Sequence, residues 1–283
     1  MFEIIKKAIL VSRPIFIPIA PAAYLFGLSA GGSSIDLIAA AEILLLTIPL
    51  GIYVFGLNDL FDIESDRANP RRKGSLWGAK IQDNDKEWIF RASALVIAAI
   101  FFTAILSMEP VHILVTALFL PFPFIYSVPP VRLKSKPVLD SLTNATYTYA
   151  PFAMGFSLSG NLGFLDMQMI LFALVFSAAH AIGTIMDLEG DRKAGIRTFA
   201  SVLGPRKAAA FAVFLLALNL PFAYNSMKSI FIVILIYFIA SMAVLAWPSE
   251  KNAKWCFVAM VASLMAWMAY AALAVVFKTL EMI

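Results

Sequence analysis

Apolar stretches long enough to cross a lipid bilayer dominate this chain of 283 residues. A transmembrane helix needs about 20 mostly apolar residues. Nine stretches meet that requirement, at residues 14–30, 37–57, 88–107, 111–127, 138–159, 168–186, 207–224, 229–247 and 254–277. Charged residues make up only 14% of the chain, whereas a soluble domain has about 25%. We therefore predict an all-α integral membrane protein with nine transmembrane helices in a bundle.

Prolines interrupt several of these stretches, at Pro18, Pro21, Pro49, Pro121, Pro123 and Pro151. Proline removes a backbone donor and bends a helix. Inside lipid this is tolerated where neighbouring groups or water satisfy the freed carbonyls. Bent helices around a central cavity open to the cytoplasmic side fit this pattern, and so does ordinary membrane packing.

The basic residues predict the orientation, because cytoplasmic loops of membrane proteins hold an excess of Lys and Arg. Of the 22 Lys and Arg residues, only Lys228 and Lys278 fall on the outer side if the N-terminus lies inside. We predict a multi-pass protein of the cell membrane with a cytoplasmic N-terminus and the C-terminus on the opposite side. A single domain, 1–283, would carry acidic cytoplasmic loops at about 58–87 and 187–206. The net charge of +4 follows from this loop pattern and does not indicate nucleic acid.

Two acidic clusters follow the second and sixth apolar stretches. The first reads N-D-x-x-D-x-x-x-D and comprises Asn58, Asp59, Asp62 and Asp66, and the second reads D-x-x-x-D and comprises Asp187 and Asp191. Offsets of three, four and seven residues place the carboxylates of each cluster on one face of a helix. The C-terminal end of a helix also carries partial negative charge. If the spans continue through the clusters, these carboxylates favour a bound cation. If a new helix begins at Asn58, the carboxylates lie at a helix N-terminus, where the dipole favours negative charge. Only their mutual repulsion then favours a bound cation.

Mg²⁺ is the cation that suits these clusters, because it takes oxygen ligands and binds through one or two carboxylates plus substrate phosphates. Basic residues that could meet the remaining phosphate oxygens lie beside the motifs or in the loop after the fourth stretch, namely Arg67, Arg132, Lys134 and Arg192. Arginine can bind phosphate through two parallel hydrogen bonds. The leading interpretation is a membrane-embedded Mg²⁺–diphosphate site in which the five aspartates bind metal and act in catalysis.

Other interpretations of the same residues are open. The aspartates could be solvated loop charges, and the basic residues could reflect topology alone. In a cation transporter, carboxylates bind the transported ion, but such sites usually lie near the bilayer midplane. No G-x-x-x-x-G-K-[ST] loop occurs, which argues against nucleotide hydrolysis. Two histidines are too few for a histidine-based metal site. We expect His112 at the far interface and His180 in a helix–helix contact.

Taken together, the motifs resemble those of the UbiA-type intramembrane prenyltransferases over essentially the whole chain. The matching tracts are G-L-N-D-L-F-D-I-E-S-D-R-A-N-P at 56–70, Y-S-V-P-P-V-R-L-K at 126–134 and D-L-E-G-D-R-K-A-G-I-R-T-F-A-S-V-L-G at 187–204. The resemblance implies nine helices, with the motifs on cytoplasmic loops after the second and the sixth. It also implies that the first motif, Asn58 included, holds one Mg²⁺ and the diphosphate, and that the second holds another Mg²⁺. Arg132 and Lys134 match basic positions expected to meet the diphosphate.

The tract after the first motif indicates a branch of that family. Members that act on quinone precursors often continue R-x-N-R-P-x-R-P-I, whereas this chain reads D-R-A-N-P-R-R-K-G at 66–74. With P-V-L-D-S-L-T-N at 137–144 and A-G-I-R-T at 194–198, it is similar to the lycopene elongases. Those members attach five-carbon units to the ends of a linear carotenoid, in some cases with hydration.

The resemblance therefore implies an isoprenyl diphosphate donor, such as dimethylallyl diphosphate, and a lipophilic acceptor such as lycopene, within membrane lipid. A quinone precursor or another lipid is the alternative acceptor.

Overall fold

The chain folds into helices that match the predicted apolar stretches. A computed structural model describes residues 2–63, 79, 81–226 and 228–280. The chain divides into two compact units, which are described separately. The first comprises residues 1–135 and 143–173, and the second comprises residues 136–142 and 174–283.

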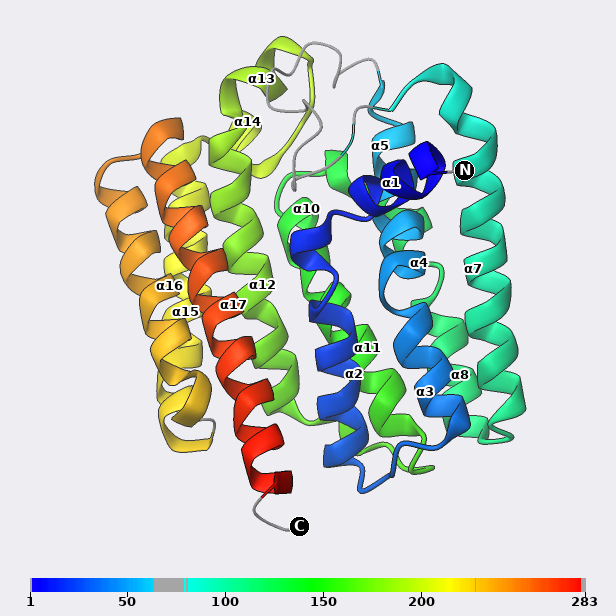
Figure 1. Cartoon of the computed structure of the whole chain (residues 1–283). Coiled ribbons are helices and arrows are strands. Elements are labelled where there is room, and N and C mark those ends of the chain that lie inside the picture. The colour runs from blue at the N-terminus through cyan, green and yellow to red at the C-terminus, as the bar shows by residue number, and fades with distance from the viewer. Residues whose placement is uncertain (1, 64–78, 80, 227, 281–283) are drawn as a thin grey trace. The chain divides into compact units, whose positions relative to one another are not determined.

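The first unit carries the first acidic motif (Figure 1). Its helices are α1 (Phe2–Val11), α2 (Ile19–Ala30), α3 (Leu37–Leu45), α4 (Ile48–Gly51), the π-helical η2 (Ile52–Gly56), α5 (Leu57–Leu60), α7 (Lys86–Leu106), α8 (Pro110–Phe119), α9 (Phe122–Ser127) and α11 (Thr146–Ser157). Short 3₁₀ turns join them: η1 (Pro14–Phe16), η3 (Asp83–Asp85), η4 (Leu133–Ser135), η5 (Thr143–Ala145) and η6 (Gly163–Leu165).

The second unit carries the second acidic motif. Its helices are α10 (Leu139–Leu142), α13 (Leu188–Lys193), α14 (Phe199–Leu203), α15 (Pro205–Ser226), α16 (Lys228–Ala246) and α17 (Glu250–Leu280). Helix α12 (Met167–Met186) begins in the first unit and continues into the second. Helix α15 packs on α16, and α16 packs on α17 (Figure 1).

Seven helical spans in the described part of the chain are long and apolar enough to cross a membrane. They cover residues 37–60, 83–106, 110–127, 167–186, 205–226, 228–246 and 250–273. A further pair, residues 5–11 and 14–30, bends by 61° and would make an eighth span if it crosses as one. The protein is thus a multi-pass membrane protein, and the number nine stays a prediction.

The structure divides the predicted stretch 138–159 into α10, η5 and α11. Hydroxyl side chains bond to the backbone at this break, and the Thr146 hydroxyl donates to the Thr143 carbonyl at 2.6 Å. Such local bonds compete with regular helix. The apolar composition of the stretch therefore overstated its helical continuity.

Two glycines bring α2 and α11 into direct backbone contact. A Cβ atom at Gly27 would lie 2.0 Å from the carbonyl oxygen of Phe152, and one at Gly155 would lie 2.1 Å from that of Tyr24. Small residues allow such close packing between membrane helices. This contact fixes the position of Tyr24 against α11.

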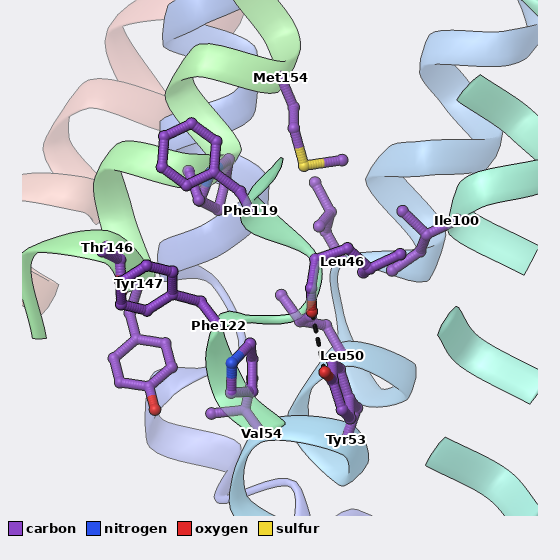
Figure 2. Close-up of a pocket in the computed structure, with 14 residues that line it drawn as sticks. Leu46, Leu50, Tyr53, Val54, Ile100, Phe119, Phe122, Thr146, Tyr147 and Met154 are labelled. Carbon is purple, nitrogen blue, oxygen red and sulfur yellow. Dashed lines mark hydrogen bonds between the residues drawn. The ribbon is translucent and has the colours of Figure 1, made fainter. Parts of the chain in front are cut away.

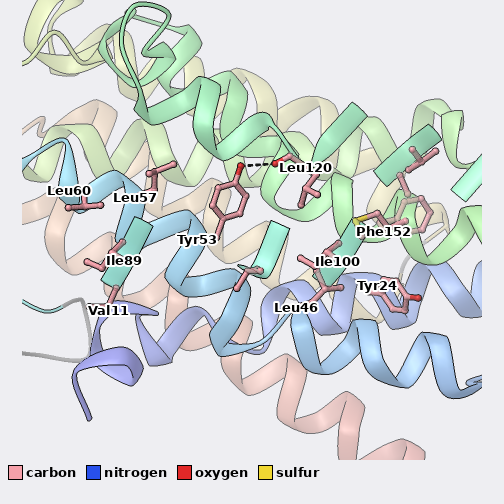
Figure 3. Close-up of a cluster of buried hydrophobic side chains, with 14 of the residues drawn as sticks. Val11, Tyr24, Leu46, Tyr53, Leu57, Leu60, Ile89, Ile100, Leu120 and Phe152 are labelled. Carbon is pink, nitrogen blue, oxygen red and sulfur yellow. Dashed lines mark hydrogen bonds between the residues drawn. The ribbon is translucent and has the colours of Figure 1, made fainter. Parts of the chain in front are cut away.

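Figure 3 shows how the buried side chains of the first unit follow one another along the bundle. Leu57 lies toward the end that carries the acidic motif, Tyr53 comes next, and Leu46 and Ile100 follow. Tyr24 lies at the opposite end of this series. The Tyr53 hydroxyl donates to the Leu120 carbonyl at 2.8 Å, where the chain passes from α8 to α9.

Candidate active site

The first acidic motif lies where a membrane span ends. The span of residues 37–60 ends in α5, so Asn58 and Asp59 occupy its last turn and Asp62 lies two residues after its end. The helix runs into the motif from the apolar side without a break, because η2 and α5 are continuous. These carboxylates therefore lie at the negative end of the helix dipole, where a cation is favoured. Asp66 and Arg67 lie outside the described residues.

Asp62 is held by two of the predicted basic residues. Nη2 of Arg132 lies 2.9 Å from its Oδ1, and Nζ of Lys134 lies 2.7 Å from its Oδ2. Lys134 also donates to the side-chain oxygen of Asn58 at 2.7 Å and to its backbone carbonyl at 3.1 Å. The structure thus brings four of the predicted site residues into one cluster.

Lys134 is a buried cation, with only 8% of its surface exposed. Burial disfavours the charged form and lowers the pKa of the Lys134 amino group below its ordinary value, and the neighbouring Asp62 carboxylate opposes this shift. Arg132 has φ of 40°, in the left-handed region. Residues held in this conformation cluster at functional sites.

Arg13 completes this group, although in the sequence it counts only among the basic residues of the predicted cytoplasmic side. Its Nη2 lies 2.8 Å from Oδ1 of the fully buried Asp59, and its Cζ lies 4.6 Å from the ring centroid of Phe55, one turn earlier on the same span. Like Arg132, it has positive φ, at 52°. No spacing in the sequence connects Arg13 with residue 59, so only the fold reveals the pair.

Two arginine nitrogens indicate how an anion could bind at this motif. The Nε groups of Arg13 and Arg132 are buried and have no hydrogen-bond partner within the described structure. A buried N–H group without an acceptor is destabilising, and phosphate oxygens would supply acceptors. The carboxylate and amide oxygens nearby are the ligands that Mg²⁺ prefers. Over the described ranges, no three His, Cys, Asp or Glu side chains form a metal cluster, and Asp66 lies beyond them.

The second motif begins where α12 ends. Asp187 follows the last residue of α12 and precedes the first residue of α13. Asp191 is buried, and its Oδ2 accepts a hydrogen bond from the Thr198 hydroxyl at 2.9 Å. The Arg192 side chain is exposed. Since this motif belongs to the second unit, a cavity shared by the two motifs stays a prediction.

Asp140 supports the second motif and was not identified from the sequence. It is fully buried, and its carboxylate accepts from the backbone N–H groups of Phe199 at 2.6 Å and of Ser141 at 2.8 Å. The first bond anchors the segment that positions Thr198 against Asp191. A carboxylate within an apolar stretch is expensive and commonly functional, which is the signal that could have identified it. His180 lies 3.2 Å from the Ser141 hydroxyl, a contact between helices as expected.

An apolar pocket lies within the first unit (Figure 2). Its volume is about 40 Å³. It is lined by Leu46, Leu50, Tyr53, Val54, Ile100, Phe119, Leu120, Phe122, Pro123, Thr146, Tyr147, Ala150, Pro151 and Met154. Val54 precedes Asn58 by four residues, about 6 Å along a helix. The pocket therefore approaches the first motif from the apolar side.

The fold is shared with solved UbiA homologs. A UbiA homolog from Archaeoglobus fulgidus bound to GPP and Mg²⁺ matches with a TM-score of 0.65 at 18% sequence identity, over 93% of this chain and 99% of that chain. The likeness is one of fold, and it agrees with the multi-pass helical membrane architecture described above.

The sequence comparison then gives the family. A profile of the UbiA prenyltransferase family matches residues 17–281, and the chain belongs to this family. A lycopene elongase/hydratase from Corynebacterium glutamicum is 34% identical over 225 residues, which cover 76% of this chain and 75% of that protein. A lycopene elongase/hydratase from Halobacterium salinarum is 32% identical over 71% of this chain and 72% of its own length.

Proposed function

We propose that this prenyltransferase moves an isoprenyl group from an allylic diphosphate, dimethylallyl diphosphate in particular, to a linear carotenoid such as lycopene. The similarity to lycopene elongase/hydratases supports the acceptor. One observation carries the reaction type, which is the cluster of Asp62, Arg132, Lys134 and Asn58 at the end of a membrane span. Such a cluster suits a substrate with a charged head and an apolar tail.

The acidic residues would hold Mg²⁺ with the substrate. The proposed ligands are Asp59, Asp62 and Asp66 in the first motif and Asp187 and Asp191 in the second. When bound, the metal neutralises charge on the diphosphate and makes it a better leaving group. Arg67 and Arg192, each next to a motif aspartate in the sequence, are proposed as further donors to the diphosphate.

The described basic residues have a defined part in the reaction. Arg132 and Lys134 now contact Asp62, and we assign them to the diphosphate once substrate and metal are present. The bond between C1 of the donor and the diphosphate oxygen breaks, and the diphosphate leaves with the electron pair. Donors positioned where this charge develops stabilise the transition state.

The acceptor completes the transfer. Its terminal π bond supplies the electron pair for the new carbon–carbon bond, which leaves a carbocation on the acceptor. This cation loses a proton to water or takes up water and then releases a proton. The aromatic faces of Tyr53, Phe119 and Tyr147 line the pocket and could each stabilise an allylic cation by about 0.5–2 kcal/mol. A dry pocket also protects the cation from premature hydrolysis.

Expression in a lycopene-producing host tests this function. We expect carotenoids that are heavier by one or two five-carbon units. Asp62→Asn and Asp187→Asn should abolish them, because each removes a charge proposed to hold metal. Asp83→Asn is the control, since its side chain is 58% exposed and pairs with the exposed Lys86.

The outcome separates the alternatives. Unchanged lycopene together with a prenylated quinone precursor would assign the protein to the branch of the family that acts on quinone precursors. Full activity of both Asn variants at wild-type expression would refute the metal–diphosphate assignment. Cation flux in proteoliposomes without diphosphate release would favour the transporter interpretation.

A further inference from the structure

A buried polar network lies inside the first unit, away from the acidic motif. Its centre is Glu42 of α3, whose side chain is fully buried. The Tyr24 hydroxyl donates to its Oε2 at 2.7 Å, and the Thr103 hydroxyl donates to its Oε1 at 3.1 Å. Nε2 of His112 lies 2.9 Å from the same Oε1. Helices α2, α3, α7 and α8 therefore meet at one carboxylate. His112 is fully buried among them, and its expected place at the far interface stays a prediction.

The other ring nitrogen of His112 connects the network to α11. Nδ1 lies 2.9 Å from the Met154 carbonyl and 3.0 Å from the Ser157 hydroxyl. The Ser157 hydroxyl donates to the same Met154 carbonyl at 2.8 Å. All side-chain nitrogens and oxygens of this pair thus have partners. The hydrocarbon tail of a substrate has no hydrogen-bonding groups to replace these bonds. It therefore cannot displace the network without leaving buried polar groups unsatisfied.

The network closes the pocket at the end away from the acidic motif. Three pocket-lining residues adjoin it. Leu46 lies one turn after Glu42, and its N–H bonds to the Glu42 carbonyl at 2.8 Å. Ile100 lies one turn before Thr103, and the Thr103 hydroxyl donates to its carbonyl at 2.8 Å.

The third residue is Met154, which lines the pocket with its side chain and bonds to His112 through its carbonyl. Figure 2 shows Met154 at one end of the pocket and Tyr53 and Val54 at the other. Since Val54 lies four residues before Asn58 in the sequence, one end of the pocket approaches the motif and the other end adjoins the network.

The space between the two ends is small. A cavity of about 150 Å³ binds benzene, which has six carbons, whereas this pocket has about 40 Å³. A short branched group could enter after modest side-chain movement. A ten-carbon chain would need the far end to move, and that end is backed by the network.

We propose that the Glu42–His112 network is the fixed floor of the donor pocket and restricts the donor to a five-carbon allylic diphosphate. This inference rests on the proposed function, and it adds the residues that set the donor's length. Leu46, Ile100 and Met154 form the apolar surface of the floor, and the network holds them from behind.

The test uses the full-length chain in liposomes that contain lycopene and Mg²⁺. Equal amounts of five-, ten-, fifteen- and twenty-carbon allylic diphosphates compete, and mass spectrometry identifies the products. Thermal stabilisation by the matching thiolodiphosphates, which resist cleavage, measures donor binding without an acceptor. Leu46→Ala removes part of the floor surface. Leu44→Ala is the matched control, because Leu44 lies only two residues before Leu46 but is 69% exposed.

Wild type and Leu44→Ala should use and bind the five-carbon donor. Leu46→Ala should raise the use of the ten-carbon donor, relative to the five-carbon one, by about tenfold or more, since pocket changes of one or two methylene groups give effects of about 10–200-fold. Donors of fifteen and twenty carbons should stay excluded, because the network remains in place. Equal ratios in Leu46→Ala and Leu44→Ala, or a Leu46→Ala variant that accepts all lengths, would overturn the proposal.

A second variant addresses the network itself. Glu42→Ala combined with His112→Ala removes both members of the pair and leaves no unpaired charge. If it elutes from gel filtration like wild type, it should accept fifteen carbons, and unchanged selectivity in this folded variant would contradict a fixed floor. If it does not fold, the comparison of Leu46→Ala with Leu44→Ala alone tests the proposal. Failure of the proposed function would look different from these changes in donor selectivity, because the wild-type protein would then release diphosphate from none of the four donors.

Discussion

Replacing Lys134 by Met tests whether the buried cation holds the first motif together. Its amino group makes three polar contacts, with Asp62 at 2.7 Å and with the side chain and carbonyl of Asn58 at 2.7 and 3.1 Å. A hydrogen bond to a charged group contributes about 1.5–3 kcal/mol, and breaking a buried pair costs about 3–5 kcal/mol. In the variant, Asp62 still pairs with Arg132, and the Met side chain fills most of the space that the Lys134 side chain occupied. We therefore expect the free energy of unfolding to fall by about 2–3 kcal/mol.

Two measurements follow from this magnitude. At 2–4 °C per kcal/mol, the apparent melting temperature in detergent should fall by about 4–12 °C. Release of diphosphate should slow by about 10²-fold or more, because a donor to the developing charge is lost. Lys136→Met is the control, since Lys136 lies two residues further and is exposed. A Lys134→Met variant with the stability and turnover of Lys136→Met would refute the structural reasoning.

Two further predictions concern Lys134 and the second motif. Burial lowers the pKa of Lys134 below 10.5, so the unfolded chain binds more protons between the two pKa values, and stability rises with pH in that window. Activity that needs the charged amine should fall in the same window, and Lys134→Arg should move this loss to higher pH. An unchanged pH–rate profile would contradict a role for the charge. Asp140→Asn should weaken Mn²⁺ binding, followed by electron paramagnetic resonance, by about 10–100-fold. The reason is that the Asn amide has one acceptor oxygen, whereas the two oxygens of Asp140 accept from the backbone N–H groups of Phe199 and Ser141. One of these bonds is then lost, and the segment that holds Thr198 becomes less fixed. Wild-type Mn²⁺ affinity would show that Asp140 does not position this motif.

The membrane spans could be predicted because their signal is local. A helix in lipid must satisfy its own backbone bonds, so a long apolar run is sufficient to indicate it. The stretch 168–186 was predicted, and α12 covers Met167–Met186. The stretch 138–159 was less predictable, because hydroxyl groups such as that of Thr146 compete for the backbone. Hydropathy does not register this competition.

The candidate site was predictable to the extent that its residues are close in the sequence. The spacing from Asn58 to Asp62 indicated an acidic motif, and its position at a span end agrees with the structure. Arg13 and Asp140 depend on contacts across 46 and 59 residues, which no spacing reveals. Glu42 gave a signal that was overlooked, namely a carboxylate inside an apolar stretch.

The π-helical turn η2 determines which way the first motif points. A π turn holds one residue more than an α turn, and one residue corresponds to a rotation of about 100° around the helix axis. Residues from Leu57 onward are therefore rotated by that angle relative to a regular continuation of α4. A regular helical wheel that continues α4 through residue 60 therefore assigns Asp59 to the wrong side of the helix. Grafting this motif onto another membrane helix would require residues 52–56 as well, since they carry the rotation.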